Sequence, residues 1–429
     1  MASLARIAAL PQGAMQIVGR GWFHLLGGLM LAVVAPAFIR YDGNPGFPQP
    51  GSAWNTIVGI TLAVSVGFHV LTKVTRFPEV RATSYVFPCF VGTYGVVLLI
   101  FFFFRIDYAR SLFLGSFILC VIWFFHAILL TRLRTRAAFA VIPIGSVGRL
   151  RGVRTADFSM LASPVFPERL PDALIADFRA DLPGEWEHFI ADWVLGGRPA
   201  YHVKDAMEML TGRVDIEHLS ENSFGSLDPA LGYRNIKRVL DVLIAILLLP
   251  AFFLLTLVVG AAIMLGSSGP VFFRQERVGY RGRLFKVLKF RTMTHVPDVG
   301  AGSREAAMTR AADPRVTRVG RVLRRSRIDE IPQLFNVLKG EMSWIGPRPE
   351  AKPLSTWYGE ELPFYSYRHI VRPGITGWAQ VNQGHVVDMQ DVLGKLHYDF
   401  YYIKYFSPWL DVFIAIRTLW IMAGGQGSR

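Results

Sequence analysis

The sequence predicts a membrane protein with four N-terminal transmembrane helices, a small α/β cytoplasmic domain, and a C-terminal α-rich domain anchored by a Pro-kinked re-entrant membrane helix. Two observations predict this class. The 429 residues are 52% hydrophobic and only 18% charged, whereas soluble domains carry about 25% charged residues. Long apolar runs occupy the first third of the chain, and one further run, interrupted by a proline, precedes a strongly basic C-terminal half.

Residues 1–132 contain four apolar stretches, each close to the ~20 residues that cross a bilayer as a helix. They cover residues 22–39, 53–72, 83–104 and 110–131. Basic residues lie before the first stretch, between the second and third, and after the fourth, which places both ends of the bundle in the cytoplasm. Four buried helices of a soluble protein are the alternative, but apolar runs this long with few charges are rare in soluble cores.

Residues 133–233 are polar and predict a small cytoplasmic α/β domain with a structural or regulatory role. The stretches "AAFAVIPIGSVGRL" and "DALIADF" each predict a strand, and "AYHV" is compatible with another. The stretch "LPGEWEHFIADWVLGGRP" predicts a helix with Pro183 near its start and two glycines after its end. Gly145 and Gly148 invite a nucleotide-binding interpretation, but G-S-V-G is not G-x-G-x-x-G, so this motif is weak.

The positive charge belongs to the C-terminal half. Residues 234–429 hold 27 of the 46 Lys and Arg and 15 of the 32 Asp and Glu, and so carry +12 of the net charge of +14. Basic surfaces attract anionic lipid, nucleic acid or phosphorylated substrates. Beside membrane helices we expect membrane lipid and phosphorylated substrates, and no nucleic acid. The two cysteines, Cys89 and Cys120, lie in apolar runs, which excludes a disulfide framework and a cysteine-based zinc site.

The apolar run that opens this half predicts a re-entrant helix over residues 236–265. Pro250 lies in its middle, where proline removes a backbone hydrogen bond and kinks a helix. Basic clusters lie both before and after the run, so a full span would put one of them outside, against the orientation bias. A helix that enters, bends at Pro250 and leaves on the same face satisfies both observations. A kinked fifth span is the alternative.

The sequence after Gly266 predicts a compact, loop-rich globular domain, so residues 234–429 form the third part of the chain. Its last helical stretch, "WLDVFIAIRTLWIM", is apolar through almost every turn. It fits either an interfacial anchoring helix or a buried core helix.

An adjacent acid pair, Asp329–Glu330, follows several arginines in "RRSRIDEIPQLFNVLKG". Arginine binds phosphate oxygens through paired hydrogen bonds, and arginines around a carboxylate favour its ionised form and so lower its pKa. Such a carboxylate is able to attack phosphorus, and a second one beside it suits Mg²⁺, which bridges to substrate phosphates. A simpler explanation is an acid pair at a helix start, with Pro332 in the first turn. The two explanations are compatible, because a helix N-terminus also stabilises a phosphoryl group.

Four stretches between about residue 234 and residue 420 carry a family resemblance: "KRVLDVLIAILLLP", "GPVFFRQERVGYRGRLFKVLKFRTM", "DPRVTRVGRVLRRSRIDEIPQLFNVLKGEMSWIGPRP" and "VRPGITGWAQVN". Over this range the chain resembles the monotopic phosphoglycosyl transferases, bacterial sugar transferases that load a sugar 1-phosphate onto polyprenyl phosphate. The N-terminal parts are similar to the long undecaprenyl-phosphate glucose or galactose phosphotransferase type, in which they support dimerisation or regulation. The resemblance implies a multi-pass enzyme of the bacterial inner membrane, with its active site at the cytoplasmic face and a homodimer as a candidate state.

The resemblance also implies residue roles. Asp329 would attack the β-phosphate of a UDP-sugar, UMP would leave, and undecaprenyl phosphate would take the phosphosugar from the aspartyl intermediate. Glu330 would help to hold Mg²⁺ together with Asp329. Family basic positions expected to bind substrate phosphates are Lys289 in "KFRTM", Arg324, Arg348 in "GPRP" and Arg372 in "VRPG". For the last two, an equal alternative is an arginine that fixes a loop by pairing with backbone carbonyls.

Two stretches depart from the family pattern. Leu249–Pro250 stands where Ser-Pro is frequent, and "QVNQGHVVD" stands where "QVN" often continues with Gly-Arg-Asn. His385 is a candidate to replace that arginine, although a lone histidine is more often structural. The competing hypothesis is a catalytically idle membrane scaffold or regulator of polysaccharide assembly, and the intact acid pair and basic positions favour the enzyme. The sequence identifies neither the sugar nor the polysaccharide, whether exopolysaccharide, capsule or O-antigen.

Overall fold

The computed structural model describes residues 21–40, 51–74, 82–132, 138–153, 156–168, 170–215, 231–294, 315–383 and 388–423. The chain divides into two compact units, Met1–Thr211 and Gly212–Arg429. The first unit contains the N-terminal helices and a parallel sheet, and the second contains the acid pair.

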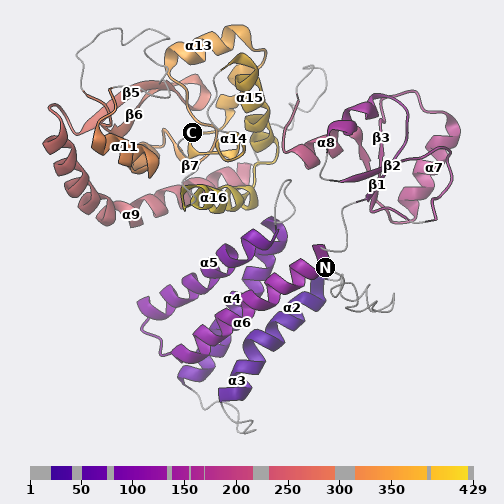
Figure 1. The fold of residues 1–429 in the computed structure, drawn as a ribbon, viewed down its shortest axis with the longest axis horizontal. Helices are drawn as coiled ribbons and strands as arrows, with labels where there is room; N and C mark the ends of the chain where they lie inside the picture. Colours follow the sequence, from indigo (N-terminus) through magenta and orange to yellow (C-terminus); the bar gives the residue numbers. More distant parts are fainter. Residues whose placement is uncertain are drawn as a thin grey trace, which may run out of the picture. The chain divides into compact units, whose positions relative to one another are not determined.

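The four predicted apolar stretches are helices (Figure 1). The first runs from α2 (Gly21–Leu29) through a π-helical turn (Met30–Val34) to α3 (Ala35–Arg40), and the others are α4 (Ser52–Val74), α5 (Ala82–Phe103) and α6 (Arg110–Arg132). These helices, and a fifth over Gly232–Gly266, are long and apolar enough to cross a membrane. Large apolar side chains such as Phe102 and Leu114 are exposed on them, as lipid contact requires. The chain is therefore a membrane protein.

Glycines allow close packing between α4 and α5. A Cβ added at Gly59 or Gly67 would come within 2.5 Å of the ring of Phe101 or Phe90, respectively, and small residues at such contacts let helix backbones approach. The Thr56 hydroxyl of α4 accepts a hydrogen bond of 2.8 Å from the backbone N–H of Ala109, just before α6.

The predicted α/β domain contains a four-stranded parallel sheet in the order β2-β1-β3-β4. Its strands are β1 (Ala138–Val141), β2 (Asp157–Met160), β3 (Ala173–Ala176) and β4 (Ala200–His202). The predictions of β1, β3 and β4 are confirmed, as is that of α7 (Gly184–Leu195), which begins after Pro183 and ends at Gly196. Strand β2 and helix α8 (Val203–Thr211) were not predicted.

The glycine turn of this domain is fixed by a neighbouring carboxylate. Gly145 has a φ of 80°, and a side chain there would clash with Asp177. The Asp177 carboxylate accepts hydrogen bonds from the backbone N–H and the hydroxyl of Ser146, at 2.9 and 2.6 Å. The turn is thus stabilised from within the domain.

The second unit alternates helices with two small sheets. The first sheet is the antiparallel hairpin of β5 (Phe272–Val278) and β6 (Leu284–Phe290), and the second is the parallel pair of β7 (Ser343–Ile345) and β8 (Gly374–Thr376). The helices are α9 (Leu231–Gly266), α11 (Arg318–Arg325), α12 (Leu334–Lys339), α13 (Lys352–Glu361), α14 (Trp378–Asn382), α15 (Met389–Lys404) and α16 (Pro408–Ala423).

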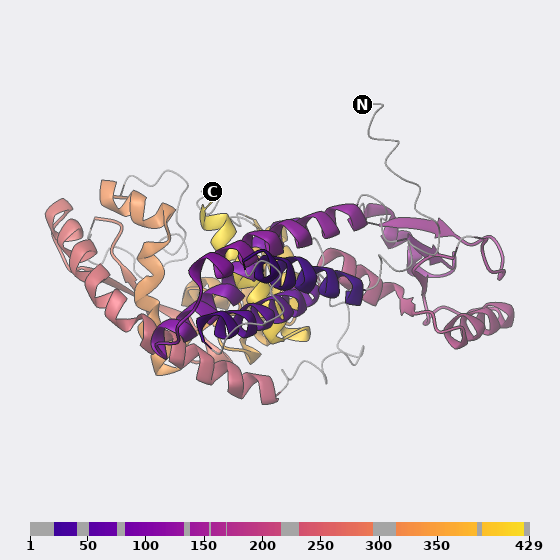
Figure 2. The same ribbon diagram turned by 90° about the horizontal axis from the view of Figure 1, so that it is seen from below.

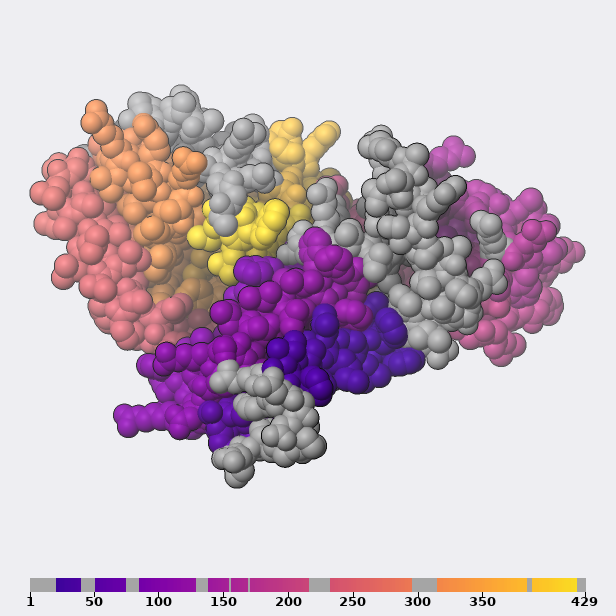
Figure 3. Space-filling model, turned by 60° about the horizontal axis from the view of Figure 1, so that its bottom comes forward, coloured from indigo at the N-terminus to yellow at the C-terminus, as the bar shows by residue number. Residues whose placement is uncertain are grey.

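Helix α9 is a single 36-residue helix that contains Pro250 and bends in its middle (Figures 1 and 2). Both of its halves pack on the same globular domain. Before Pro250, Ala245 joins a core with Val287, and after it, Phe252 joins a core with Phe290. Most other apolar side chains of α9 are exposed, and atoms in the pink of its second half and of the hairpin after it form one outer edge of this unit in Figure 3.

Helix α16 combines the two predicted alternatives. Leu410 and Phe413, in its first turns, are fully buried, as in a core helix. Leu419 and Trp420, near its end, are 67% and 64% exposed, as in a helix that reaches an apolar environment.

Candidate active site

A sharp turn presents the acid pair. Arg327 has a left-handed backbone conformation, with φ 54° and ψ 18°, which is unfavourable for a residue with a side chain. After it begins a short 3₁₀ helix, Ile328–Gln333, which carries Asp329 and Glu330 in its first turn. This confirms that the pair lies at a helix start. Ile331 anchors the turn on the core that includes the second half of α9.

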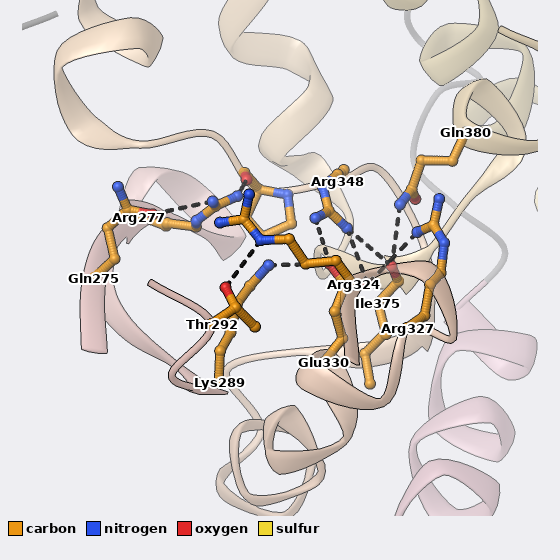
Figure 4. Close-up of polar contacts among 11 residues, drawn as sticks. Gln275, Arg277, Lys289, Thr292, Arg324, Arg327, Glu330, Arg348, Ile375 and Gln380 are labelled. Atoms are coloured by element: carbon orange, nitrogen blue, oxygen red, sulfur yellow. Dashed lines mark hydrogen bonds and ion pairs between the residues drawn. The ribbon is translucent and has the colours of Figure 1, made fainter. Parts of the chain in front are cut away.

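Glu330 is held by three cationic side chains from three segments of the chain (Figure 4). Its Oε1 lies 3.0 Å from Lys289 Nζ of β6 and 2.5 Å from Arg348 Nη2. Its Oε2 lies 3.4 Å from Arg348 Nη1 and 3.5 Å from Arg327 Nη1. Burial by itself would raise the pKa of Glu330, but Arg348 and Lys289 outweigh it and hold this pKa well below its ordinary value.

Asp329 has a different environment, although its side chain is also only 8% exposed. Among the residues that the structure describes, its carboxylate has no hydrogen-bond or ion-pair partner. Burial raises the pKa of Asp329, and the charge of Glu330 adds to the rise, while the charges of Lys289, Arg348 and Arg324 only partly offset it. The predicted lowering of pKa is therefore confirmed for Glu330 and wrong for Asp329, because burial outweighs cations that do not touch it.

Arg324 is fixed at one end and open at the other. Its Nε donates a hydrogen bond of 2.9 Å to Thr292 Oγ1 (Figure 4). Helix α11 lies close to this segment, since a Cβ at Gly320 would come within 2.0 Å of the Thr292 carbonyl oxygen. The two terminal nitrogens of Arg324 make no hydrogen bond within the described ranges. They are available to oxygen atoms of a bound anion.

The structure brings Lys289, Arg324 and Arg348 around the acid pair and places Arg372 elsewhere. Arg372 Nε donates to the Gly340 carbonyl at 3.0 Å, and its guanidinium lies 5.2 Å from the centre of the Tyr280 ring. This geometry matches the loop-fixing alternative for Arg372. His385 lies outside the described residues.

Sequence reasoning assigned no role to three polar residues of this site. Thr292 holds Arg324, Arg327 contacts Glu330, and Arg277 donates to the Pro349 carbonyl beside Arg348. Thr292 belongs to the "KFRTM" stretch that also contains Lys289, and its place in that stretch was a signal that could have pointed to it. Nothing in the spacing paired it with an arginine 32 residues later.

The acid pair is a fair donor set for Mg²⁺. This ion is usually bound by one or two carboxylates together with substrate phosphates and water. Asp329 has a free carboxylate, and Glu330 Oε2, whose partners lie 3.4 and 3.5 Å away, keeps room for another bond. The described residues contain no group of three or more His, Cys, Asp and Glu side chains suited to a metal. An ion at this pair would therefore need further oxygen ligands from substrate and solvent.

A free carboxylate beside several cations, on a basic domain with an apolar helix, defines a site for chemistry on an anionic substrate. Comparison with known proteins identifies the class. The family model described as bacterial sugar transferase matches residues 232–425.

One similar protein aligns with most of the chain, and two others align with less than half of it. The UDP-N-acetylgalactosamine-undecaprenyl-phosphate N-acetylgalactosaminephosphotransferase of Aeromonas hydrophila is 41% identical over 405 residues, 94% of this chain and 94% of that protein. The undecaprenyl-phosphate glucose phosphotransferase of Komagataeibacter xylinus is 47% identical over 43% of this chain and 35% of its own length. The UDP-glucose:undecaprenyl-phosphate glucose-1-phosphate transferase of Escherichia coli K12 is 40% identical over 43% of this chain and 40% of its own length. The chain belongs to the bacterial sugar transferase family, and it is an enzyme.

Proposed function

We propose that this enzyme transfers a sugar 1-phosphate from a UDP-sugar to undecaprenyl phosphate, producing undecaprenyl-diphospho-sugar and UMP as the first membrane step in building a surface polysaccharide. The names of the relatives support the two substrates. The observation that carries the mechanism is the contrast between Asp329, whose carboxylate is free, and Glu330, whose carboxylate is held by three cations. Because N-acetylgalactosamine appears in the name of the relative that aligns with 94% of this chain, UDP-N-acetylgalactosamine is the first donor to test.

In the first step, an oxygen of the Asp329 carboxylate bonds to the β-phosphorus of the UDP-sugar. The bond from that phosphorus to the oxygen bridging the two phosphates breaks, and UMP leaves with the electron pair. Arg324, with its terminal nitrogens open, is placed to bind the diphosphate oxygens on which charge develops. A sugar-phosphoryl group then remains bonded to Asp329.

In the second step, a phosphate oxygen of undecaprenyl phosphate bonds to the same phosphorus, and the bond to Asp329 breaks. The aspartate is regenerated as a carboxylate, so the cycle needs no net proton transfer to the enzyme. Glu330 neutralises part of the charge of Lys289 and Arg348 and keeps both beside Asp329. Asp329 and Glu330 would hold Mg²⁺, which neutralises charge on the phosphate oxygens when bound.

We also propose how the chain sits in the membrane. Helices α2–α3, α4, α5 and α6 span the bacterial inner membrane, and the N-terminal parts serve dimerisation or regulation. Helix α9 enters and leaves on the cytoplasmic face. Support comes from its two ends: Arg238 near its start donates to the Val337 carbonyl at 2.5 Å, and Arg291 donates to the Ser267 carbonyl just after its end at 2.8 Å. One globular domain holds both ends, and it cannot lie on both sides of a bilayer.

The reaction is tested with purified full-length protein, a panel of labelled UDP-sugars, undecaprenyl phosphate and Mg²⁺. UMP release together with a labelled lipid product supports the proposal. No turnover with any donor in the panel would favour a scaffold that recruits other enzymes of polysaccharide assembly. Asp329→Asn is the matched inactive control, because it preserves shape and removes the charged nucleophile.

The metal proposal predicts that EDTA abolishes UMP release and that added Mg²⁺ restores it. Mg²⁺ alone should hardly change the Tm of the substrate-free protein, because most ligands of the ion are expected from substrate and water. A large rise in Tm with Mg²⁺ in the absence of substrate would contradict this arrangement and indicate a complete protein-built site.

A further inference from the structure

Arg348 lies in a loop, and loops rarely hold a charged side chain in place by themselves. The loop joins β7 to α13, and its first residue, Gly346, is pressed against the chain beside it: a Cβ there would lie 2.4 Å from the Arg372 carbonyl oxygen. The backbone carbonyl of Arg348 itself accepts a hydrogen bond of 2.8 Å from Arg368 Nη2. The residue that holds Glu330 is thus itself held, through its main chain, by a second arginine.

Arg368 is buried, with 3% of its surface exposed, in the 3₁₀ helix Tyr365–Ile370. Its Nη2 also donates to Asp399 Oδ2 at 2.7 Å, and its Nη1 donates to the Tyr365 hydroxyl at 2.9 Å. Asp399, on α15, is 1% exposed. One planar guanidinium therefore joins α15, the 3₁₀ helix and the loop of Arg348.

A buried ion pair is a weak way to gain stability, because removing both charges from water costs nearly as much as their attraction returns. Replacing a buried ion pair by apolar side chains of similar volume is often neutral or stabilising. Only a guanidinium offers the rigid fork of donors that reaches a carboxylate, a hydroxyl and a carbonyl together. This set of hydrogen bonds is better suited to fixing the position of the Arg348 loop than to stabilising the fold.

We propose that Arg368 and Asp399 are positioning residues that set the location of Arg348, and through it the charge beside Asp329. This positioning role rests on the proposed function, since the reaction of the site is itself proposed. Neither residue touches the acid pair in the structure. Their effect on the reaction is expected to pass entirely through Arg348.

The decisive variant is Arg368→Lys, which keeps the charge and loses the fork. We expect kcat to fall about 10- to 100-fold, since displacements near 1 Å have effects of that size. Combined with Arg348→Gln, which removes the charge that Arg368 is proposed to position, it should cost little beyond Arg348→Gln alone. Losses that multiply in the double variant would overturn the proposal.

A second readout separates positioning from loss of structure. Both Arg368→Lys and Asp399→Asn should lower kcat, because each loosens the guanidinium that holds the Arg348 carbonyl. KM for the UDP-sugar should change much less than kcat, since neither residue touches the acid pair. The control is Asp177→Asn, which removes a buried carboxylate from the other unit and should leave kcat unchanged. An unchanged kcat in both test variants contradicts the proposal.

Exchange of backbone amide hydrogens in the loop over residues 346–351 is also measured without substrate. Arg368→Lys should speed this exchange relative to the wild type, and an unchanged exchange rate would count against the contact. An inactive wild type would end the proposed function, while this measurement would still decide whether Arg368 holds the loop of Arg348. Additive losses in an active enzyme would end the positioning role alone.

Discussion

Asp329 and Glu330 are adjacent carboxylates with different partners, and this difference indicates different roles in the reaction. Glu330 is bonded to Lys289, Arg348 and Arg327, so much of its charge is neutralised. Asp329 has no such partner in the described part of the chain. A nucleophile must have a free oxygen, which is the condition of the Asp329 carboxylate. The geometry therefore favours Asp329 for attack on phosphorus and Glu330 for holding the cations in place.

The pKa values predict a bell-shaped pH dependence of kcat. Asp329 must be ionised, and since its pKa is raised by burial, turnover should be lost as the pH falls through a value above that of an ordinary aspartate. Burial lowers the pKa of Lys289 to about 8, against the opposing charge of Glu330. Turnover should therefore also be lost as the pH rises through about 8, when this lysine becomes neutral.

The variant Lys289→Arg checks the alkaline limb, because a guanidinium stays charged throughout this range. Its alkaline limb should move to higher pH while the acid limb stays. A wild-type rate that is constant across the pKa of Lys289 would show that its charge is not needed.

Arg324 should bind the diphosphate through its open terminal nitrogens. Arg324→Gln is expected to lower kcat/KM roughly 10- to 100-fold, since a hydrogen bond to a charged group contributes about 1.5–3 kcal/mol. Arg325→Gln is the matched control, because this neighbour on α11 is exposed and contacts no part of the acid pair. Equal losses of kcat/KM in the two variants would mean that only the total charge of α11 matters for binding.

The sequence was sufficient to predict the acid pair, its helix-start location and three of the surrounding cations. It was not sufficient to predict which cation touches which carboxylate. Lys289 and Glu330 are 41 residues apart, and their contact depends on how β6 packs against the turn. The pKa of Asp329 was predicted in the wrong direction for the same reason, since burial depends on tertiary packing.

Among the secondary structure elements, α9 determines where the site lies. The half of α9 before Pro250 packs into one hydrophobic core, and the half after it packs into a second core. The second core also contains Ile331, which follows the acid pair in the sequence. In the proposed topology, in which α9 stays at one face of the bilayer, this packing would bring the acid pair near the phosphate level of the membrane. A straight span would carry half of this packing surface through the lipid.

Cysteine labelling in intact cells tests this topology. With Cys89 and Cys120 replaced, a cysteine in place of Ser268, just after α9, should react only with reagents that reach the cytoplasm. A cysteine in place of Asp107, in the exposed turn between α5 and α6, should react from outside and serves as the control. Labelling of position 268 from outside would indicate a fifth span.

The long apolar elements were predicted well, as were the short strands β1, β3 and β4, whereas β2 and α8 were missed. The apolar helices were evident from the length of their apolar runs, and α7 from Pro183 near its start and the glycines after its end. Strand β2, only four residues long and mostly exposed, has no apolar pattern to reveal it. The bend of α9 was predicted from Pro250, but its packing against two cores depends on residues such as Val287 and Phe290 that are distant in sequence.

For the molecule as a whole, charge and hydropathy are divided between the parts. The C-terminal half carries +12 of the net charge of +14, and it also contains the helix with exposed apolar side chains. Such a domain is attracted to an anionic leaflet and anchored in it. A lipid-linked phosphate and a nucleotide sugar from the cytoplasm could then meet at one site, which is what a single covalent relay through Asp329 requires.

The most direct test of this relay is mass spectrometry of the full-length protein, quenched rapidly after mixing with a UDP-sugar and Mg²⁺ in the absence of undecaprenyl phosphate. The account predicts UMP release and a sugar-phosphate adduct on the peptide that contains Asp329, lost when the lipid acceptor is added and absent in Asp329→Asn. An adduct on another residue, or full turnover with no adduct at any time, would contradict it.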